Sequence, residues 1–182
     1  MQRQHQNLTY FILSAFFAAI LGVSALFKIP AAGVEITLQT LFVMLSGALL
    51  GPKYGTLSVI LYLAMGLLGI PVFTKGGGPA YVLEPSFGYL VGFIPCACLA
   101  GVFARQKTHI GALFLCFFVS LLPVYLFGAA HLYLISHFYL GRSLSFASLL
   151  IAGVLVFLPV DVFSCLLSAW ITKTATPNFR HF

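Results

Sequence analysis

A single aspartate stands in a segment of the sequence that is otherwise apolar. Asp161 lies in VLVFLPVDVFSCLLSAW, residues 154–170, and no other charged side chain occurs in that segment. A charge inside a bilayer is unfavourable by at least about 2.5 kcal/mol on insertion scales, so intramembrane carboxylates usually face a bundle interior and mark functional sites. Asp161 is therefore predicted to face the bundle interior, either protonated or held by hydrogen-bond donors, and to accept hydrogen bonds from N–H groups of a polar ligand. A structural aspartate bonded to a neighbouring helix is the alternative.

The residues around Asp161 support this inward orientation. Ser164, Cys165 and Ser168 follow it at the spacing i+3, i+4 and i+7, which places them on the same helix face. Pro159 precedes it by two residues and removes a backbone hydrogen bond, which predicts a local opening of the helix. The helix thus presents one polar stripe to the bundle.

Gln39 is a second polar group at the edge of an apolar segment, between Thr37 and Thr40 in ITLQT. Together with Asp161 and nearby aromatic side chains, it would suit a small, uncharged polar ring. The carboxylate would accept N–H groups, while an amide or hydroxyl would donate to a carbonyl. A glutamine near a helix end with no ligand is the alternative.

The sequence contains no arrangement typical of an enzyme or a metal site. It has no GxxxxGK[ST] phosphate-binding loop, and its three acidic residues lie in different regions. His131 and His137 are six residues apart, which suits neither a metal pair nor a catalytic dyad. We therefore predict no catalytic residue, no metal and no cofactor. The four cysteines are expected to be free thiols that pack as small apolar side chains (Cys96, Cys98, Cys116 and Cys165). Three tyrosines are expected to be ordinary interface or core aromatic residues (Tyr125, Tyr133 and Tyr139).

The composition identifies the elements that must position these groups. The 182-residue chain is 61% hydrophobic and 7% charged, whereas soluble domains carry about 25% charged residues. It is predicted to be an all-α integral membrane protein with a single membrane domain, residues 1–182, because spans in lipid must satisfy their own backbone groups. Six spans are expected, at about 8–27, 37–51, 54–70, 87–104, 111–136 and 145–172.

Two segments near the N-terminus allow alternatives. The apolar run Leu8–Phe27 could belong to a signal peptide, but its 20 residues exceed the roughly 7–15 of a signal sequence, so we expect a retained span. The second predicted span is short. It is either tilted or preceded by a part of 29–37 that re-enters the membrane.

The basic residues are expected to set the orientation in the membrane. The net charge is +6, but the nine lysines and arginines lie near predicted span ends, which favours a topology signal over nucleic-acid binding. Six fall on the side of the two termini (Arg3, Lys53, Arg105, Lys107, Lys173 and Arg180) and three on the other side (Lys28, Lys75 and Arg142). This excess predicts a multi-pass protein of the inner (cytoplasmic) cell membrane with both termini cytoplasmic. Glu35 and Glu84 then lie on the outer side.

The one long connection, residues 71–87, joins the third and fourth predicted spans. Three consecutive glycines followed by Pro79 break regular structure there. A solvated loop is one possibility. We expect instead a lid over the outer mouth of the bundle, because Tyr81, Val82 and Leu83 are apolar and irregular backbone of this kind tends to line a cavity.

The first span carries small residues at a spacing of four. Ser14, Ala18 and Gly22 form one set, and Ala15 and Ala19 form another. Such stripes let a second helix approach closely in lipid. They indicate either internal packing or a face that docks a partner.

Two stretches carry a combined set of motifs: ITLQTLFVMLSGALLGPKYGTLSVILYLAMGLLGIPVF, residues 36–73, and EPSFGYLVGF, residues 84–93. Together they resemble the BioY family, the biotin-binding S components of energy-coupling factor (ECF) transporters, and the similarity extends over about 20–172. The resemblance implies a six-helix protein, surrounded by membrane lipid, that captures biotin near the outer surface. A T component and two ATP-binding cassette ATPases would drive its toppling in the membrane. Ala15 and Ala19 would dock to the T component.

The chemistry of biotin suggests roles for individual residues under this resemblance. Asp161 would accept hydrogen bonds from the two ureido N–H groups of biotin. Gln39 and Tyr89 are candidate donors to the ureido carbonyl or walls of the site. The outer loop backbone could approach the ligand and close over it at its three glycines, Gly76, Gly77 and Gly78.

The chain departs from the family pattern at two positions. The last helix of BioY proteins usually reads G-D-x-x-K, whereas here Asp161 is retained and Ser164 replaces the lysine. We count Ser164 among the site residues, and we expect Lys75 to bind the carboxylate of the biotin tail. Glu84 stands where the family commonly has a glycine.

Two other functions remain as alternatives. The lost lysine would suit an S component for a different small vitamin. An intramembrane enzyme or a purely structural membrane protein is the other alternative, and an enzyme would convert its ligand rather than release it unchanged.

Overall fold

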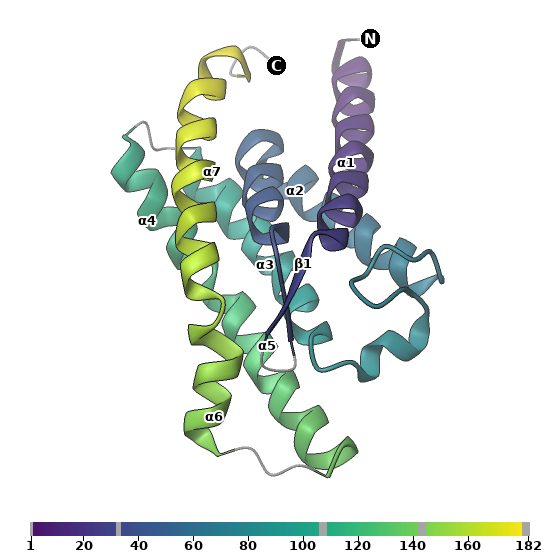
Figure 1. Ribbon diagram of the computed structural model, residues 1–182. Coiled ribbons are helices and arrows are strands. Elements are labelled where there is room, and N and C mark those ends of the chain that lie inside the picture. The colour runs from purple at the N-terminus through teal and green to yellow at the C-terminus, as the bar shows by residue number, and fades with distance from the viewer. Residues whose placement is uncertain (1, 32–33, 106–108, 142–144, 180–182) are drawn as a thin grey trace.

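The computed structural model describes residues 2–31, 34–105, 109–141 and 145–179. It is a helical bundle with one small β-hairpin and one long loop (Figure 1). Helix α2 lies between α1 and α7 and packs on α3. The elements are α1 (Gln2–Leu26), β1 (Lys28–Ala31), β2 (Val34–Thr37), α2 (Gln39–Leu67), the 3-10 helix η1 (Pro79–Leu83), α3 (Phe87–Ala104), α4 (Ile110–Ser120), α5 (Leu122–Leu134), the π-helix η2 (Ile135–Tyr139), α6 (Phe146–Leu150), the π-helix η3 (Ile151–Leu155) and α7 (Leu158–Phe179).

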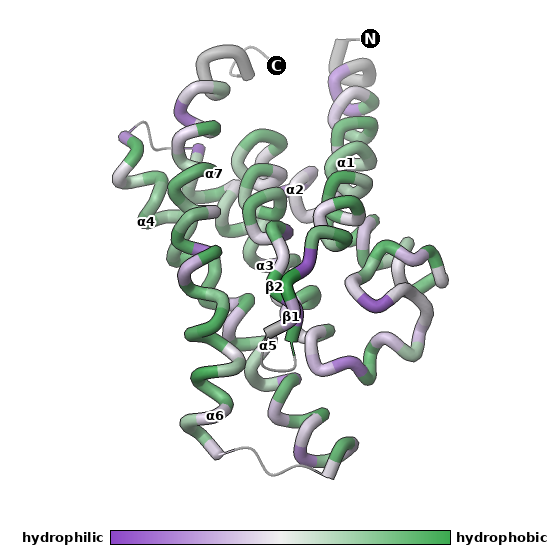
Figure 2. The backbone as a smooth tube through the Cα atoms, in the orientation of Figure 1, coloured by the Kyte–Doolittle hydropathy of each residue, from purple (hydrophilic) through white to green (hydrophobic). Residues whose placement is uncertain are grey.

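Five helical stretches among these residues are long and apolar enough to cross a membrane. They are Gln6–Leu26, Gln39–Leu67, Phe87–Ala104, Ile110–Tyr139 and Phe146–Ala175. Hydrophobic residues cover most of their length, whereas hydrophilic residues gather at helix ends and in the loops (Figure 2). The structure therefore agrees with the predicted helical membrane fold.

Helix α2 contains both the second and the third predicted span, which is why five stretches stand where the sequence predicts six. Its backbone leaves the helical region at Gly51 (φ 81°, ψ 171°). The chain reverses direction at this break, and two hydrogen bonds join the residues before it to those after it. The Gln39 amide donates to the Tyr62 hydroxyl (2.8 Å), and the Ser46 hydroxyl donates to the Gly55 carbonyl (3.4 Å). Each half of α2 is shorter than the roughly 20 residues of a full span.

The segment between α1 and α2 forms a β-hairpin, which the sequence analysis did not predict. β1 and β2 pair antiparallel, with Lys28 opposite Thr37 and Ile29 opposite Ile36. This pairing satisfies backbone groups that a re-entrant extended segment would leave without partners. Lys28 also donates to the Thr74 carbonyl, which connects the hairpin to the loop after α2.

The last span is interrupted just before Asp161, as Pro159 led us to expect. The π-helix η3 precedes a turn at 156–157, and α7 begins at Leu158. Within this turn the Phe157 amide bonds to the Val154 carbonyl (3.1 Å) rather than to that of Gly153. The Gly153 carbonyl instead accepts a hydrogen bond from the Tyr89 hydroxyl of α3 (2.9 Å). Asp161 consequently lies in the first turn of α7, not within an unbroken helix.

The two small-residue stripes of α1 face different surroundings. Ser14 and Ala18 are buried, and the Ser14 hydroxyl donates to the Tyr54 carbonyl of α2 (3.0 Å). Ala15 and Ala19 are exposed on the outer face of the bundle. Internal packing thus accounts for the first stripe and leaves the second exposed.

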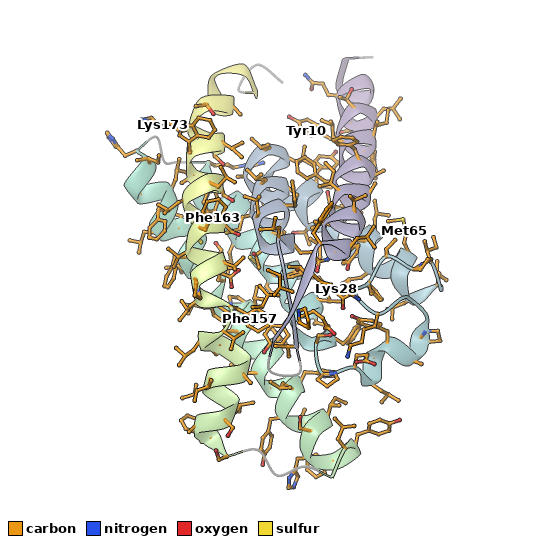
Figure 3. All side chains as sticks on the ribbon, in the orientation of Figure 1. Tyr10, Lys28, Met65, Phe157, Phe163 and Lys173 are labelled. Atoms are coloured by element: carbon orange, nitrogen blue, oxygen red, sulfur yellow. The ribbon has the colours of Figure 1, made fainter. Side chains whose placement is uncertain are left out.

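The start of α1 and the end of α7 lie at the same end of the molecule (Figure 1). Lys173 lies towards that end on α7, whereas Lys28 follows the opposite end of α1 (Figure 3). Lys173 and Lys28 therefore lie on different sides of the bundle, as the sequence analysis predicted. Lys107, Arg142 and Arg180 of the charge count, and the side chain of Arg3, lie outside the described residues.

We expect Gly51→Ala to destabilise the fold. The φ and ψ angles of Gly51 belong to a region that is accessible almost only to glycine, and a methyl group there would also meet the Arg105 guanidinium. The expected cost is about 1–3 kcal/mol, measured as a lower Tm of the purified protein. The control is Gly111→Ala in α4, where no other described residue outside the local helix backbone lies within 4 Å of the added carbon. Equal Tm values for the two variants would contradict this role of Gly51.

Candidate functional site

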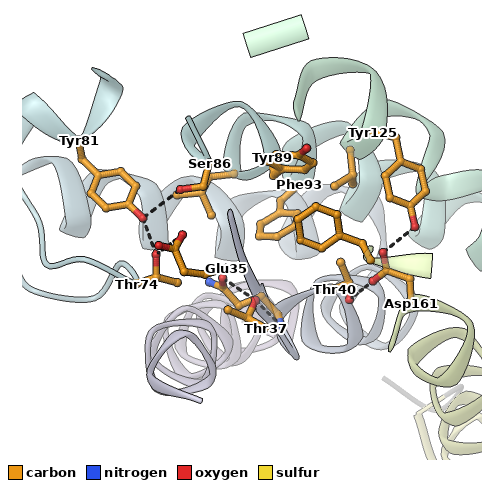
Figure 4. A pocket seen from close by; sticks show the side chains of 14 residues that line it. Glu35, Thr37, Thr40, Thr74, Tyr81, Ser86, Tyr89, Phe93, Tyr125 and Asp161 are labelled. Carbon is orange, nitrogen blue, oxygen red and sulfur yellow. Dashed lines mark hydrogen bonds between the residues drawn. The ribbon is translucent and has the colours of Figure 1, made fainter. Parts of the chain in front are cut away.

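A pocket lies between the hairpin, α2, α3, α5, the start of α7 and the loop before α3 (Figure 4). The space between its atoms, including the open mouth, is about 500 Å³. Polar groups stand at its two ends and aromatic rings between them. The lining residues are Glu35, Thr37, Gln39, Thr40, Thr74, Tyr81, Ser86, Tyr89, Leu90, Phe93, Val124, Tyr125, Phe157 and Asp161.

Asp161 forms the inner polar end of the pocket and is only 3% exposed. Its Oδ1 accepts from the Thr40 hydroxyl of α2 (2.7 Å), and its Oδ2 accepts from the Tyr125 hydroxyl of α5 (2.6 Å). The N-terminal end of α7 adds a favourable dipole for a negative charge. Ion pairs within 4.0 Å involve only Lys75 among the described residues, so hydroxyl groups rather than a cation stabilise this carboxylate.

The carboxylate of Asp161 retains capacity for a ligand. Two carboxylate oxygens offer about four acceptor positions, and the bonds to Thr40 and Tyr125 use one on each oxygen. Asp161 therefore bonds to neighbouring helices, as one alternative expected, and it also lines a pocket. Its binding of a ligand stays a prediction. A ligand with two adjacent N–H donors would complete its hydrogen bonds.

The outer polar end of the pocket is built by the loop before α3. The Tyr81 hydroxyl bonds to Thr74 Oγ1 (2.7 Å) and lies 3.5 Å from Ser86 Oγ. Thr74 also donates to Glu35 Oε2 (3.4 Å) of β2. Tyr81 is buried, in line with the expectation for the loop, whereas Val82 and Leu83 are exposed.

Aromatic side chains form the middle of the pocket. Tyr89 packs on Phe157 with ring centroids 5.0 Å apart, and Phe93 lies beside them (Figure 4). Since the Tyr89 hydroxyl donates to Gly153, the residue serves as a wall of the pocket, one of the two roles predicted for it.

Gln39 lines the pocket, but its polar atoms are bonded to the protein. Its amide nitrogen donates to the Tyr62 hydroxyl (2.8 Å) and to the Leu21 carbonyl (3.3 Å). Its Oε1 accepts from the Thr37 hydroxyl (3.0 Å). Gln39 therefore joins α1 to both halves of α2, and this arrangement favours a wall role over donation to a ligand.

Lys75 does not line the pocket but lies at its mouth. Its Nζ pairs with Glu84 Oε2 (2.7 Å) and with Glu35 Oε1 (3.3 Å), and Glu35 is a lining residue. The hydrogen bond to Glu84 raises the pKa of Lys75 above its ordinary value, and the nearby Glu35 carboxylate adds to this shift. The ammonium group therefore carries its full charge at neutral pH.

The three glycines and Ser164 also lie away from the pocket lining. Gly76 and Gly78 adopt positive φ angles (113° and 108°), and Gly76 closes a tight turn with Phe73 through two backbone hydrogen bonds. These residues, with Gly77 between them, shape the loop. Ser164 is fully buried on α7, and its hydroxyl has no hydrogen-bond partner among the described residues.

The donors to Asp161 are among the pocket residues that the sequence analysis missed, as are Thr74, Ser86, Phe93 and Phe157. Tyr125 was expected to be an ordinary interface or core aromatic residue, and Thr40 was noted only as a neighbour of Gln39. A buried carboxylate implies that donors exist, but no local pattern connects Asp161 with residues 36 and 121 positions away.

These features define a small multi-pass membrane protein with an open-mouthed pocket that has polar groups at both ends. The BioY family model matches residues 1–181. A relative from Lysinibacillus sphaericus, named probable biotin transporter BioY, is 34% identical over 99% of this chain and 92% of its own length. A relative of the same name from Pyrococcus horikoshii is 37% identical over 82% of this chain and 85% of its own. The chain belongs to the BioY family.

A solved structure shares this fold. It is the crystal structure at 2.1 Å of the S-component for biotin from an ECF-type ABC transporter. The TM-score is 0.80 at 31% sequence identity, and the match covers 95% of this chain and 93% of that one. The family resemblance predicted from the sequence is thereby confirmed, and the curated relatives are named as transporters rather than enzymes.

We expect Tyr125→Phe to lower the stability of the protein, because it leaves one buried oxygen of Asp161 without a donor. A loss of this kind costs about 1–3 kcal/mol and would appear as a lower Tm. Tyr133→Phe is the matched control, since this tyrosine is 40% exposed and does not line the pocket. If both variants melt at the wild-type temperature, Tyr125 does not stabilise the carboxylate.

Proposed function

We propose that this protein captures biotin at the outer side of the membrane as the S component of an ECF-type transporter. The observation that carries the proposal is the Asp161 carboxylate, which two hydroxyl groups hold at the inner end of a pocket while acceptor positions remain. The likeness to a solved biotin S component supports it.

The pocket suits biotin along its whole length. The two ureido N–H groups would donate to Asp161, a charge-assisted contact that a low-dielectric interior strengthens. The apolar thiophane ring would pack between Tyr89, Phe93 and Phe157. The anionic tail would then extend toward the mouth, where Lys75 supplies a positive charge.

We infer that Thr40 and Tyr125 fulfil the role of the missing family lysine toward Asp161. They supply two donors to the carboxylate from α2 and α5. Ser164, at the position of that lysine, lies outside the pocket lining and does not bond to Asp161. The replacement of a cation by neutral donors leaves the pocket more negative. A different small vitamin is therefore the second candidate ligand.

We propose that the loop from 68 to 86 acts as a lid over the pocket. It contributes Thr74, Tyr81 and Ser86 to the outer end. Its connections to the hairpin are polar contacts near the surface, the pairing of Lys75 with Glu35 among them. Such contacts are individually weak. Phe73, by contrast, is buried and packs on Tyr62 of α2 with ring centroids 5.4 Å apart. Opening would therefore involve the part of the loop after Phe73, while Phe73 keeps the start of the loop on α2.

The proposed partners are a T component and two ATP-binding cassette ATPases. The exposed stripe of Ala15 and Ala19 would dock to the T component, because small residues allow close helix approach in lipid. Both termini lie at one end of the bundle, and the excess of basic residues in the sequence supports a cytoplasmic location for that end. The pocket would then open toward the outside of the cell membrane.

The experiment that tests the function is isothermal titration calorimetry of the purified protein in detergent with biotin and with other small vitamins. We expect tight binding of biotin and recovery of the ligand unchanged. Tight binding of another vitamin alone would favour the second candidate, and conversion of the ligand would favour an enzyme.

We expect Asp161→Asn to weaken biotin binding by more than about tenfold, because the amide removes the charge and one acceptor from the pocket. Calorimetry measures the change in Kd. Ser168→Ala is the control, since Ser168 lies on the same face of α7, bonds to the Leu41 carbonyl (3.5 Å) and does not line the pocket. Wild-type affinity in a folded Asp161→Asn variant would remove Asp161 from the site.

We expect Ala19→Trp to block biotin transport by the reconstituted complex while biotin binding to the isolated protein is retained. The bulky ring would prevent close docking of the T component on α1. Leu126→Trp on α5 is the control, because Leu126 is also strongly exposed but lies on another helix. Normal transport by the Ala19→Trp complex would show that docking occurs elsewhere.

A further inference from the structure

Lys75 bridges two carboxylates that belong to different cavities. Its ammonium group pairs with Glu84 at 2.7 Å and with Glu35 at 3.3 Å. Glu35 lines the inner pocket, whereas Lys75 and Glu84 line a separate outer groove together with Tyr139. The ammonium group therefore stands at the boundary between the outer groove and the inner pocket.

The two carboxylates are not equally free to leave Lys75. The Glu35 side chain is 10% exposed and also accepts from the Thr74 hydroxyl. The Glu84 side chain is 34% exposed, and its contacts within the described part of the chain are with Lys75. Rotation of Glu84 into solvent would thus break one ion pair and leave the pocket wall in place.

The ion pairs of this cluster oppose the capture of an anion by Lys75. One lysine pairs with two glutamates here, while Lys28 bonds to the neighbouring Thr74 carbonyl. An incoming carboxylate would find Lys75 already paired on both sides. Once Glu84 leaves, Lys75 and Glu35 balance each other, and the ammonium group has a free side.

We propose that Glu84 competes with the tail carboxylate of the ligand for Lys75 and so limits the preference of the site for acidic over neutral tails. The Glu84 carboxylate occupies the position that a ligand carboxylate would take when it arrives from the outer groove. This inference rests on the proposed function, because it takes the ligand to be biotin with its tail at the mouth of the pocket.

The test compares biotin with biotin amide, in which the tail carboxylate is a neutral carboxamide. Calorimetry on the full-length protein in detergent gives the Kd of each ligand for the wild type and for Glu84→Gln. We expect the variant to bind biotin about threefold more tightly, a size typical of partly exposed ion pairs. The Kd for biotin amide should stay the same, and the gain for biotin should shrink at about 1 M salt, where the Debye length falls to about 3 Å.

A second variant separates competition from general repulsion. In a Lys75→Met background, addition of Glu84→Gln should give no further gain for biotin, because no ammonium group remains to compete for. A gain that persists without Lys75 overturns the proposal in favour of simple charge repulsion. Glu84→Ser is measured as well, in case Glu84→Gln misfolds. If the Kd for biotin is unchanged in both variants, the proposal is overturned. Failure of the wild type to bind either ligand contradicts the proposed function instead.

Discussion

The structure depends on the stabilisation of one carboxylate within a membrane-spanning bundle. Desolvation of Asp161 is costly, and removal of a donor to a buried charge costs more than an ordinary lost hydrogen bond. The start of α2 supplies Thr40, α5 supplies Tyr125, and α7 begins just before the aspartate. These three elements must meet at one point for the carboxylate to be tolerated. The same convergence creates the inner end of the pocket, so the contacts that stabilise the carboxylate also shape the pocket.

Each polar part of the site lies next to a departure from regular helix. The interruption between η3 and α7 releases the Gly153 carbonyl, which then fixes Tyr89. The reversal of α2 at Gly51 brings Gln39 to Tyr62. Irregular backbone inside a membrane is tolerated where protein groups satisfy it or where it lines a cavity. The breaks are therefore part of the construction of the pocket.

Hydropathy and the isolated charge of Asp161 were sufficient to predict a helical membrane protein with an inward-facing carboxylate. The boundary between the second and third predicted spans falls near the break at Gly51, and the opening before Asp161 followed from the position of Pro159. The β-hairpin was missed because its pairing joins residues whose local pattern resembles a loop. Tyr125 was missed for a related reason: its role depends on packing between distant helices. Gly76–Gly78 shape the loop rather than the pocket, a distinction that only tertiary contacts reveal.

The site extends from the Lys75 ammonium group at the mouth of the pocket, past the aromatic side chains of its middle, to the Asp161 carboxylate at its inner end. A ligand with a polar, hydrogen-donating head and an acidic tail matches this order of charges. The most direct test is a structure of the protein with biotin bound, in which the distances from the ureido nitrogens to the Asp161 oxygens are measured. The account predicts distances of about 2.7–3.2 Å with Thr40 and Tyr125 still bonded to the carboxylate. Ureido nitrogens that bond elsewhere, while Asp161 contacts only protein, would contradict it.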